Sequence, residues 1–177
     1  MAITTQRYTT VAIALHWITA VLIIVMLVIG EDWIKAPKGV APSNPNLHVS
    51  LGLLILILTV ARLAWRLMNP PPPDVPMPAW QAKASKALHW GFYAILVVIP
   101  LSGLADLDKV IGKRRPEFAD LTFFGLFKMP HYSMPWFGNL HDAFTKVAWL
   151  LLAIHVLAAL KHQFIDKDGL LRRMSPH

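Results

Sequence analysis

Histidine is the residue type whose placement in this sequence most strongly suggests chemistry. The 177 residues include eight His and no Cys. Without thiols, iron–sulfur clusters, thiolate metal sites and covalently attached haem are excluded. Four histidines stand within or at the edge of long apolar stretches: His16, His48, His141 and His155. Ionisable side chains at membrane depth are rare and usually face a bundle interior, so these four are the candidate functional residues, with interhelical hydrogen bonding as the alternative role.

The apolar stretches that carry these histidines are long enough to cross a membrane. Of all residues 55% are hydrophobic and only 15% are charged, whereas about a quarter are charged in soluble proteins. A spanning helix needs about 20 mostly apolar residues. Four segments meet this requirement, at about 11–30, 47–67, 87–105 and 139–160. Because backbone in lipid must be hydrogen-bonded internally, we expect an all-α protein, an integral membrane four-helix bundle in which 1–177 forms a single membrane domain.

The distribution of basic residues predicts the orientation of this bundle. The chain has 17 Lys and Arg against 10 Asp and Glu. Basic residues near the predicted helices cluster on the side that holds both termini and the Pro-rich linker 69–78, at Arg62, Arg66, Lys83, Lys86 and Lys161. Because such residues are enriched on the cytoplasmic side, both termini are predicted in the cytoplasm. The positive charge then gives little reason to expect a nucleic-acid partner.

Depth in the membrane groups the four histidines into two pairs. The first predicted helix starts inside, so His16 lies near the cytoplasmic face, whereas His48 opens a helix that starts outside. On the fourth helix His141 and His155 are fourteen residues apart, about 21 Å along the axis with a net rotation of about −40°, so both point the same way. The sequence therefore predicts two stacked pairs, His48 with His141 above and His16 with His155 below.

Two imidazoles from facing helices, in two places and without thiols, suit a haem iron held at both axial positions. Such iron carries one electron and has no free coordination site, so two centres would conduct electrons across the bilayer. A structural zinc site needs three or four converging ligands, commonly spaced H-x₃₋₅-H, and a carboxylate-bridged di-iron site needs Glu-x-x-His motifs. The predicted helices contain neither pattern. The predicted cofactors are two non-covalent, bis-His haem b groups, which would be membrane-embedded.

Three further residues share helix faces with histidines, two of them with His48 and one with His89 of the third predicted helix. Arg62, fourteen residues after His48, is predicted to pair with a haem propionate, and a snorkelling Arg is the alternative. Gly52 lies four residues after His48, and Gly103 lies fourteen after His89. At both glycines a missing side chain would let a ring approach, and ordinary small-residue helix packing is the alternative.

Four stretches of the chain resemble the bacterial cytochrome b-561 family of small four-helix, di-haem membrane proteins. They are ALHW at 14–17, NLHVSLGLLILILTVARLAWRL at 46–67, LHWGFYAILVVIPLSGL at 88–104 and LHDAFTKVAWLLLAIHVLAALKHQFIDKDGLLRRM at 140–174. The resemblance implies His16 and His155 on one haem b and His48 and His141 on the other. It also implies an oxidoreductase of the bacterial cytoplasmic (inner) membrane that passes electrons from a donor at the outer face to a quinone. In the best-studied kind of member, superoxide is oxidised to oxygen and ubiquinone is reduced.

The connection 106–138 would lie at the outer face, where such a donor arrives. It carries an aromatic-rich stretch, FADLTFFGLFKMPHYSMPWFG, suited to lying at the membrane interface beside a site. Its basic residues would attract an anionic donor such as superoxide: Lys109, Lys113, Arg114, Arg115 and Lys128. His89, early in the third predicted helix, is interpreted either as a quinone contact or as a packing residue.

Two other functions remain open from the sequence. One is a haem-bearing membrane anchor subunit of a larger oxidoreductase of the hydrogenase or formate dehydrogenase type, which would dock a partner enzyme on one face. The other is a non-redox helical membrane protein, such as a small transporter. The sequence makes no prediction of the oligomeric state.

Overall fold

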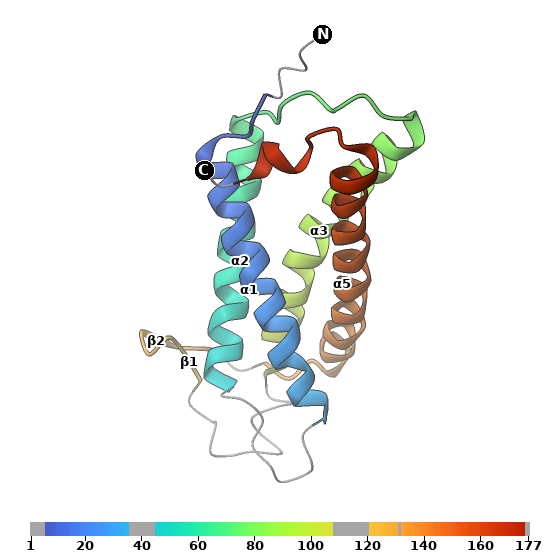
Figure 1. Ribbon diagram of the computed structural model, residues 1–177. Coiled ribbons are helices and arrows are strands. Elements are labelled where there is room, and N and C mark those ends of the chain that lie inside the picture. Colours follow the sequence, from blue (N-terminus) through green and yellow to red (C-terminus); the bar gives the residue numbers. More distant parts are fainter. Residues whose placement is uncertain (1–5, 36–44, 108–120, 131, 176–177) are drawn as a thin grey trace.

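The computed structural model describes residues 6–35, 45–107, 121–130 and 132–175. Within these ranges the long helices are α1 (Thr10–Lys35), α2 (Pro45–Met68), α3 (Ala79–Ala105) and α5 (Pro135–Lys161). Figure 1 shows them side by side, with both chain ends at one end of the bundle. We call this the terminal end. The opposite end, where a short β-hairpin projects, is the hairpin end.

The outer surface of the bundle is apolar. All four helices are long and apolar enough to cross a membrane. Many of their large aliphatic side chains face outward, and Val21, Val60 and Leu157 are each more than half exposed. Helices that are apolar all round belong in lipid, because contact with water would carry the full cost of hydrating this surface. The predicted all-α, four-helix membrane bundle is confirmed.

Three of the four long helices begin at a proline or directly after one, and the first of these, α2, starts at Pro45. α3 starts at Ala79, immediately after Pro78, although the uncharged stretch begins only at 87. The intervening residues include lysines, which are good helix formers, so they extend α3 toward the terminal end. α5 begins at Pro135, and a proline in the first helical turn removes no intrahelical hydrogen bond.

A small apolar layer fills the middle of the bundle. Its buried residues come from all four helices: Leu27, Ile55, Ile95, Leu96 and Ala148. Ala148 lies seven residues from both His141 and His155 along α5. The layer therefore separates the two levels at which the sequence predicts imidazole pairs.

Close backbone packing joins neighbouring helices in chain order. Among the described segments α1 packs on α2, α2 on α3, and α3 on α5. The pairings α1 with α5 and α2 with α5 are not among these close contacts. Across the bundle, α1 and α2 meet α5 through side chains, as at Leu27, Ile55 and Ala148.

The hairpin end carries the only β-structure within the described residues. β1 (Thr122–Phe123) pairs antiparallel with β2 (Phe127–Lys128). Two residues of the turn between the strands, Phe124 and Gly125, have φ angles of 46° and 78°. Glycine adopts such angles freely, whereas a non-glycine residue there costs about 1–2 kcal/mol. The base of the hairpin is anchored by a second buried apolar cluster, Leu107, Leu121 and Met129.

The terminal end is closed by the C-terminal segment, which crosses to the start of α1. After α5 the chain forms a short π-helix (His162–Asp166) and a short 3₁₀ helix (Leu171–Met174). Arg173 is buried and donates from Nε to the Gln6 carbonyl (2.9 Å) and from a terminal nitrogen to the Pro73 carbonyl (2.7 Å). One guanidinium thus ties the N-terminal segment, the Pro-rich linker and the C-terminus together.

Replacing this guanidinium should destabilise the fold. Arg173→Ala removes two charge-assisted hydrogen bonds inside the protein, so we expect the free energy of unfolding to fall by about 2–4 kcal/mol. Thermal unfolding of the detergent-solubilised protein measures the change. The neighbouring Arg172 is exposed, and Arg172→Ala is the matched control that should leave the melting temperature within about a degree. Equal melting temperatures for the two variants would show that the hydrogen bonds of Arg173 do not stabilise the fold.

Candidate functional site

The structure brings the four candidate histidines together in twos. At the hairpin end His48 of α2 faces His141 of α5, with ring centroids 6.2 Å apart and ring planes at 61°. At the terminal end His16 of α1 faces His155 of α5, with centroids 6.1 Å apart and planes at 65°. Both pairs span helices that do not pack closely on each other. We refer to them as the hairpin-end pair and the terminal-end pair.

The separation of the rings suits a metal ion held between them. A ligating imidazole nitrogen lies about 2 Å from a first-row metal and about 1 Å from the centre of its own ring, so two rings on opposite sides of one ion have centroids about 6 Å apart. Both pairs have this separation. In the terminal-end pair, Nδ1 of His16 is buried and has no hydrogen-bond partner among the described residues. A buried polar atom of this kind is costly unless a further group completes the site.

In the hairpin-end pair, α3 fixes the orientation of one ring. Nδ1 of His141 donates a hydrogen bond to the Ile99 carbonyl at 2.8 Å. A carbonyl can only accept, so the proton is on Nδ1 and the lone pair of Nε2 is available for a metal, which is the usual support for a ligating histidine. The residues therefore fit haem iron as the bound group.

Gly103 makes this contact possible. A Cβ at Gly103 would lie 2.9 Å from Nδ1 of His141 and 3.0 Å from Cε1, closer than real Cβ contacts allow. The ring that approaches Gly103 is therefore the imidazole of His141. At Gly52 the nearest atom to an added Cβ is Cε of Met26 at 3.8 Å, an ordinary packing distance.

The terminal-end pair has a third imidazole beside it. The ring of His89 on α3 lies 5.8 Å from that of His155, and its Nδ1 donates to the Ser85 carbonyl at 2.7 Å. His155 thus faces His16 and His89 at similar distances. The depth reasoning applied to the other histidines could have found this: α3 starts at the terminal end, and His89 lies early in it.

A cleft between the four helices opens onto the terminal-end pair. Its lining includes apolar and hydroxyl side chains together with His16, His89, His155, Arg62 and Arg66, and no carboxylate among the described residues lines it. The Arg62 guanidinium lies 5.8 Å from the ring centroid of Tyr93, a cation–π distance. Because Arg62 and Arg66 are positively charged and no described acidic side chain lines the cleft, the cleft favours anionic groups. Arg66, interpreted from the sequence only as a basic residue near a helix end, belongs to the same lining.

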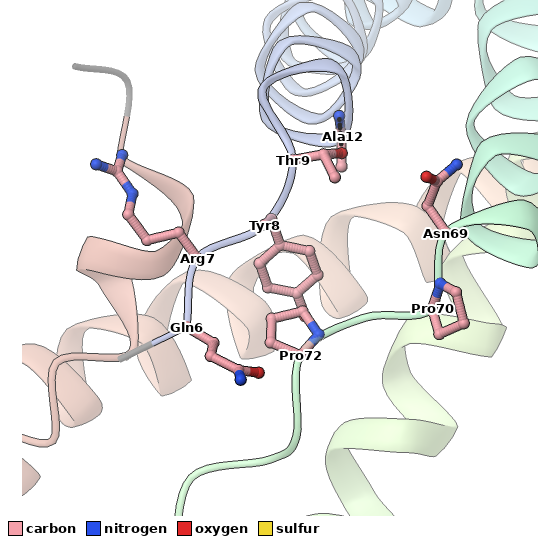
Figure 2. Close-up of a pocket in the computed structure, with 8 residues that line it drawn as sticks. All are labelled: Gln6, Arg7, Tyr8, Thr9, Ala12, Asn69, Pro70 and Pro72. Atoms are coloured by element: carbon pink, nitrogen blue, oxygen red, sulfur yellow. Dashed lines mark hydrogen bonds between the residues drawn. The ribbon is translucent and has the colours of Figure 1, made fainter. Parts of the chain in front are cut away.

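Another cavity, of about 280 Å³, lies near the chain ends and contains none of the candidate residues. Figure 2 shows its lining, with the Arg7 side chain turned away from Tyr8 and Pro72. Arg7 donates to the Ser175 carbonyl instead. This cavity is a gap between the N-terminal segment and the linker, and no histidine lines it.

Most of the basic cluster predicted to attract an anionic donor lies outside the described residues: Lys109, Lys113, Arg114 and Arg115. Lys128 is described, and it is exposed on β2 at the hairpin end.

Comparison with known proteins is consistent with this geometry. The family described as prokaryotic cytochrome b561 matches residues 7–177. Cytochrome b561 homolog 2 of Escherichia coli K12 is 31% identical over 97% of this chain and 92% of its own length. A protein named probable superoxide oxidase CybB, from Yersinia pestis, is 29% identical over 97% of both chains. Cytochrome b562 of Cereibacter sphaeroides is 27% identical over 94% of both.

The contact between Gly103 and His141 can be tested by adding one methyl group. Gly103→Ala should displace the imidazole and break its bond to Ile99, and if this pair holds a b-type haem, the absorbance should shift and the reduction potential or occupancy of that haem should fall. Gly52→Ala, where the added atom has room, is the control and should leave the spectrum unchanged. Visible spectroscopy and a redox titration of both purified variants give the comparison. A Gly103→Ala protein with the wild-type spectrum and potentials would mean that the contact does not orient the ring.

Proposed function

Because the chain belongs to the prokaryotic cytochrome b561 family, we propose that it oxidises superoxide at the outer face of the bacterial inner membrane and reduces ubiquinone within the membrane. The family makes it a bacterial membrane electron-transfer protein that binds b-type haem. A non-redox helical protein, one of the alternatives left open by the sequence, is therefore set aside. The donor, the acceptor, the number of haems and their ligands are parts of the proposal.

The observation that carries the proposal is the presence of two imidazole pairs with ring centroids 6.1 and 6.2 Å apart. We assign His16 and His155 as the axial ligands of one haem b, and His48 and His141 as those of the other. When bound, the two haems would supply one-electron transfer between the two ends of the bundle. His141 and His155 are fourteen residues apart on α5, about 21 Å along the helix.

The protein's own residues would set the conditions for this chemistry. The apolar layer around Ile55 and Ala148 keeps water out of the space between the two levels. Arg62 lies in the cleft beside the terminal-end pair and would form an ion pair with one haem propionate. The single positive charge of Arg62 would neutralise the single negative charge of that propionate. The Ile99 carbonyl holds His141 in the tautomer that leaves Nε2 able to ligate.

The net reaction is balanced by two superoxide ions for each quinone. Two superoxide ions lose one electron each and become two molecules of oxygen, while one ubiquinone gains two electrons and two protons and becomes ubiquinol. We place both termini in the cytoplasm, so that the hairpin end faces the side where superoxide arrives. The printed name of the Yersinia pestis relative, probable superoxide oxidase, supports the choice of donor.

Single histidine variants test the ligand assignment. His141→Ala and His155→Ala should each lose one of two haems, because a single remaining axial ligand in an apolar bundle binds haem weakly. His16→Ala should lose the terminal-end haem as well, whereas His89→Ala should retain both. The haem content per chain, from a pyridine haemochrome assay, distinguishes these outcomes. Full haem content in His16→Ala with loss in His89→Ala would reassign the partner of His155.

The reaction itself is tested by supplying superoxide to the purified protein with excess ubiquinone. We expect ubiquinol to form and the rate of haem reduction to fall as ionic strength rises, because an anion is drawn by basic groups whose field reaches only about 8–10 Å in salt. Lys128→Glu should slow the reaction without loss of haem, and Lys83→Glu, at the other end of the bundle, is the matched control. Reduction by superoxide no faster than in a free-haem control, or no ubiquinol, would favour an anchor subunit that receives electrons from a docked enzyme.

A further inference from the structure

The β-hairpin exposes large apolar side chains at its tip. Phe124, Leu126 and Phe127 are 49%, 76% and 51% exposed. The ring of Phe123 lies against those of its neighbours, with centroids 4.9 Å from Phe124 and 5.2 Å from Phe127. Three phenylalanines and a leucine thus form one apolar tip, which we call the aromatic tip.

The location of the aromatic tip is at the edge of the apolar bundle. Figure 1 shows the hairpin projecting sideways beyond α2, at the level of the first turns of that helix. Since the helices cross the membrane, an element that leaves them sideways at this level runs along the membrane surface. Lys128 is exposed on the second strand of the same hairpin. Aromatic rings with an adjacent cation are typical of the boundary between lipid headgroups and acyl chains.

The hairpin is held firmly against α2. Asn46 Oδ1 accepts from the backbone N–H of Thr122 (2.7 Å), and Ser50 Oγ accepts from that of Phe124 (2.9 Å). Ser50 also donates to the Thr122 carbonyl at 3.1 Å and is itself buried. Asn46 and Ser50 flank His48 in the sequence, so the turn that carries this histidine is the one that holds the hairpin.

The turn residue Phe124 is unusual for its backbone conformation. Its φ of 46° lies in the left-handed region, where asparagine or glycine is the ordinary choice. A large aromatic side chain at this position is unfavourable for the turn, and although its ring contacts that of Phe123, the residue remains 49% exposed. The exposed part of this ring is available for a contact outside the chain.

We propose that the aromatic tip is a lipid anchor, which inserts into the headgroup–acyl boundary of the leaflet at the hairpin end and braces the α2 turn that carries His48. Lipid is the occupant that the placement favours, because the exposed apolar tip projects sideways from a bundle whose helices also expose apolar side chains, at the level where α2 begins. A second copy of the chain or a docked protein would be the alternative. The proposal concerns the hairpin alone and holds whatever the electron donor and acceptor are.

The absence of cysteine from the sequence allows a direct test. Leu126→Cys in the full-length protein is labelled with an environment-sensitive nitrobenzoxadiazole dye and reconstituted into phosphatidylethanolamine–phosphatidylglycerol nanodiscs. Val60→Cys, exposed on α2, is the control for lipid, and Asp74→Cys, exposed in the Pro-rich linker, is the control for water. Quenching by iodide in solution and by spin-labelled lipids with a shallow nitroxide reports the surroundings of each label.

The expected result is a blue-shifted emission from the Leu126 label, strong quenching by the shallow nitroxide, and at least fivefold weaker quenching by iodide than for the Asp74 label. Quenching by iodide equal to that of the Asp74 label would overturn the proposal. Protection from iodide without quenching by the lipid nitroxide, lost when chains are diluted to one per nanodisc, would replace the lipid with a second copy.

A variant of the turn separates anchoring from folding. Phe124→Asn should preserve the hairpin, since asparagine accepts the positive φ, but it removes one anchoring ring. We expect the Leu126 label in this background to become several-fold more accessible to iodide, while the melting temperature in detergent is unchanged or higher. Unchanged accessibility would show that the aromatic side chains do not attach the tip to lipid.

Discussion

The constraint on which this structure depends is that a buried imidazole needs partners for both of its ring nitrogens. In an apolar bundle no water is at hand to provide them, and an unpaired buried polar atom destabilises the fold. His141 meets the requirement with a carbonyl of α3 on one nitrogen and faces His48 with the rest of its ring. His16 lacks a described partner on Nδ1 and faces His155. The proposed haems would occupy the space between the rings of each pair.

The packing of the helices follows from this requirement. Helices that are neighbours in the chain pack closely, whereas the pairs that carry facing histidines remain further apart. A single layer of aliphatic side chains joins all four helices midway between the two levels. Gly103 has the opposite role, because it brings α3 close enough for its backbone to reach His141. The imidazole pairs therefore need both a wide separation of α1 and α2 from α5 and a close approach of α3 to His141.

The helices and the four central histidines were predictable because they depend on properties that are local in the sequence. Hydropathy over about 20 residues identifies a spanning segment, and fourteen residues between His141 and His155 return a helix to nearly the same face. Helix direction then gives depth, which is enough to match histidines from different helices. Family resemblance points to the same four residues.

What could not be predicted depends on contacts between distant segments. The ring that approaches Gly103 belongs to a histidine thirty-eight residues later, and no helical pattern indicates it. The burial of Arg173 against Gln6 and Pro73 joins residues that the sequence separates by most of its length. The hairpin is held by Asn46 and Ser50 across more than seventy residues. His89 was within reach of the depth argument, but its neighbour in space, His155, lies on another helix.

The most direct test of the central claim, that each imidazole pair holds one haem, is the haem content and spin state of the purified wild-type protein. A pyridine haemochrome assay against chain concentration, with electron paramagnetic resonance of the oxidised sample, provides both. We predict two haems per chain, both low-spin, because two imidazole ligands leave no open coordination position on either iron. One haem per chain, or a high-spin iron of comparable intensity, would contradict the assignment of two bis-histidine sites.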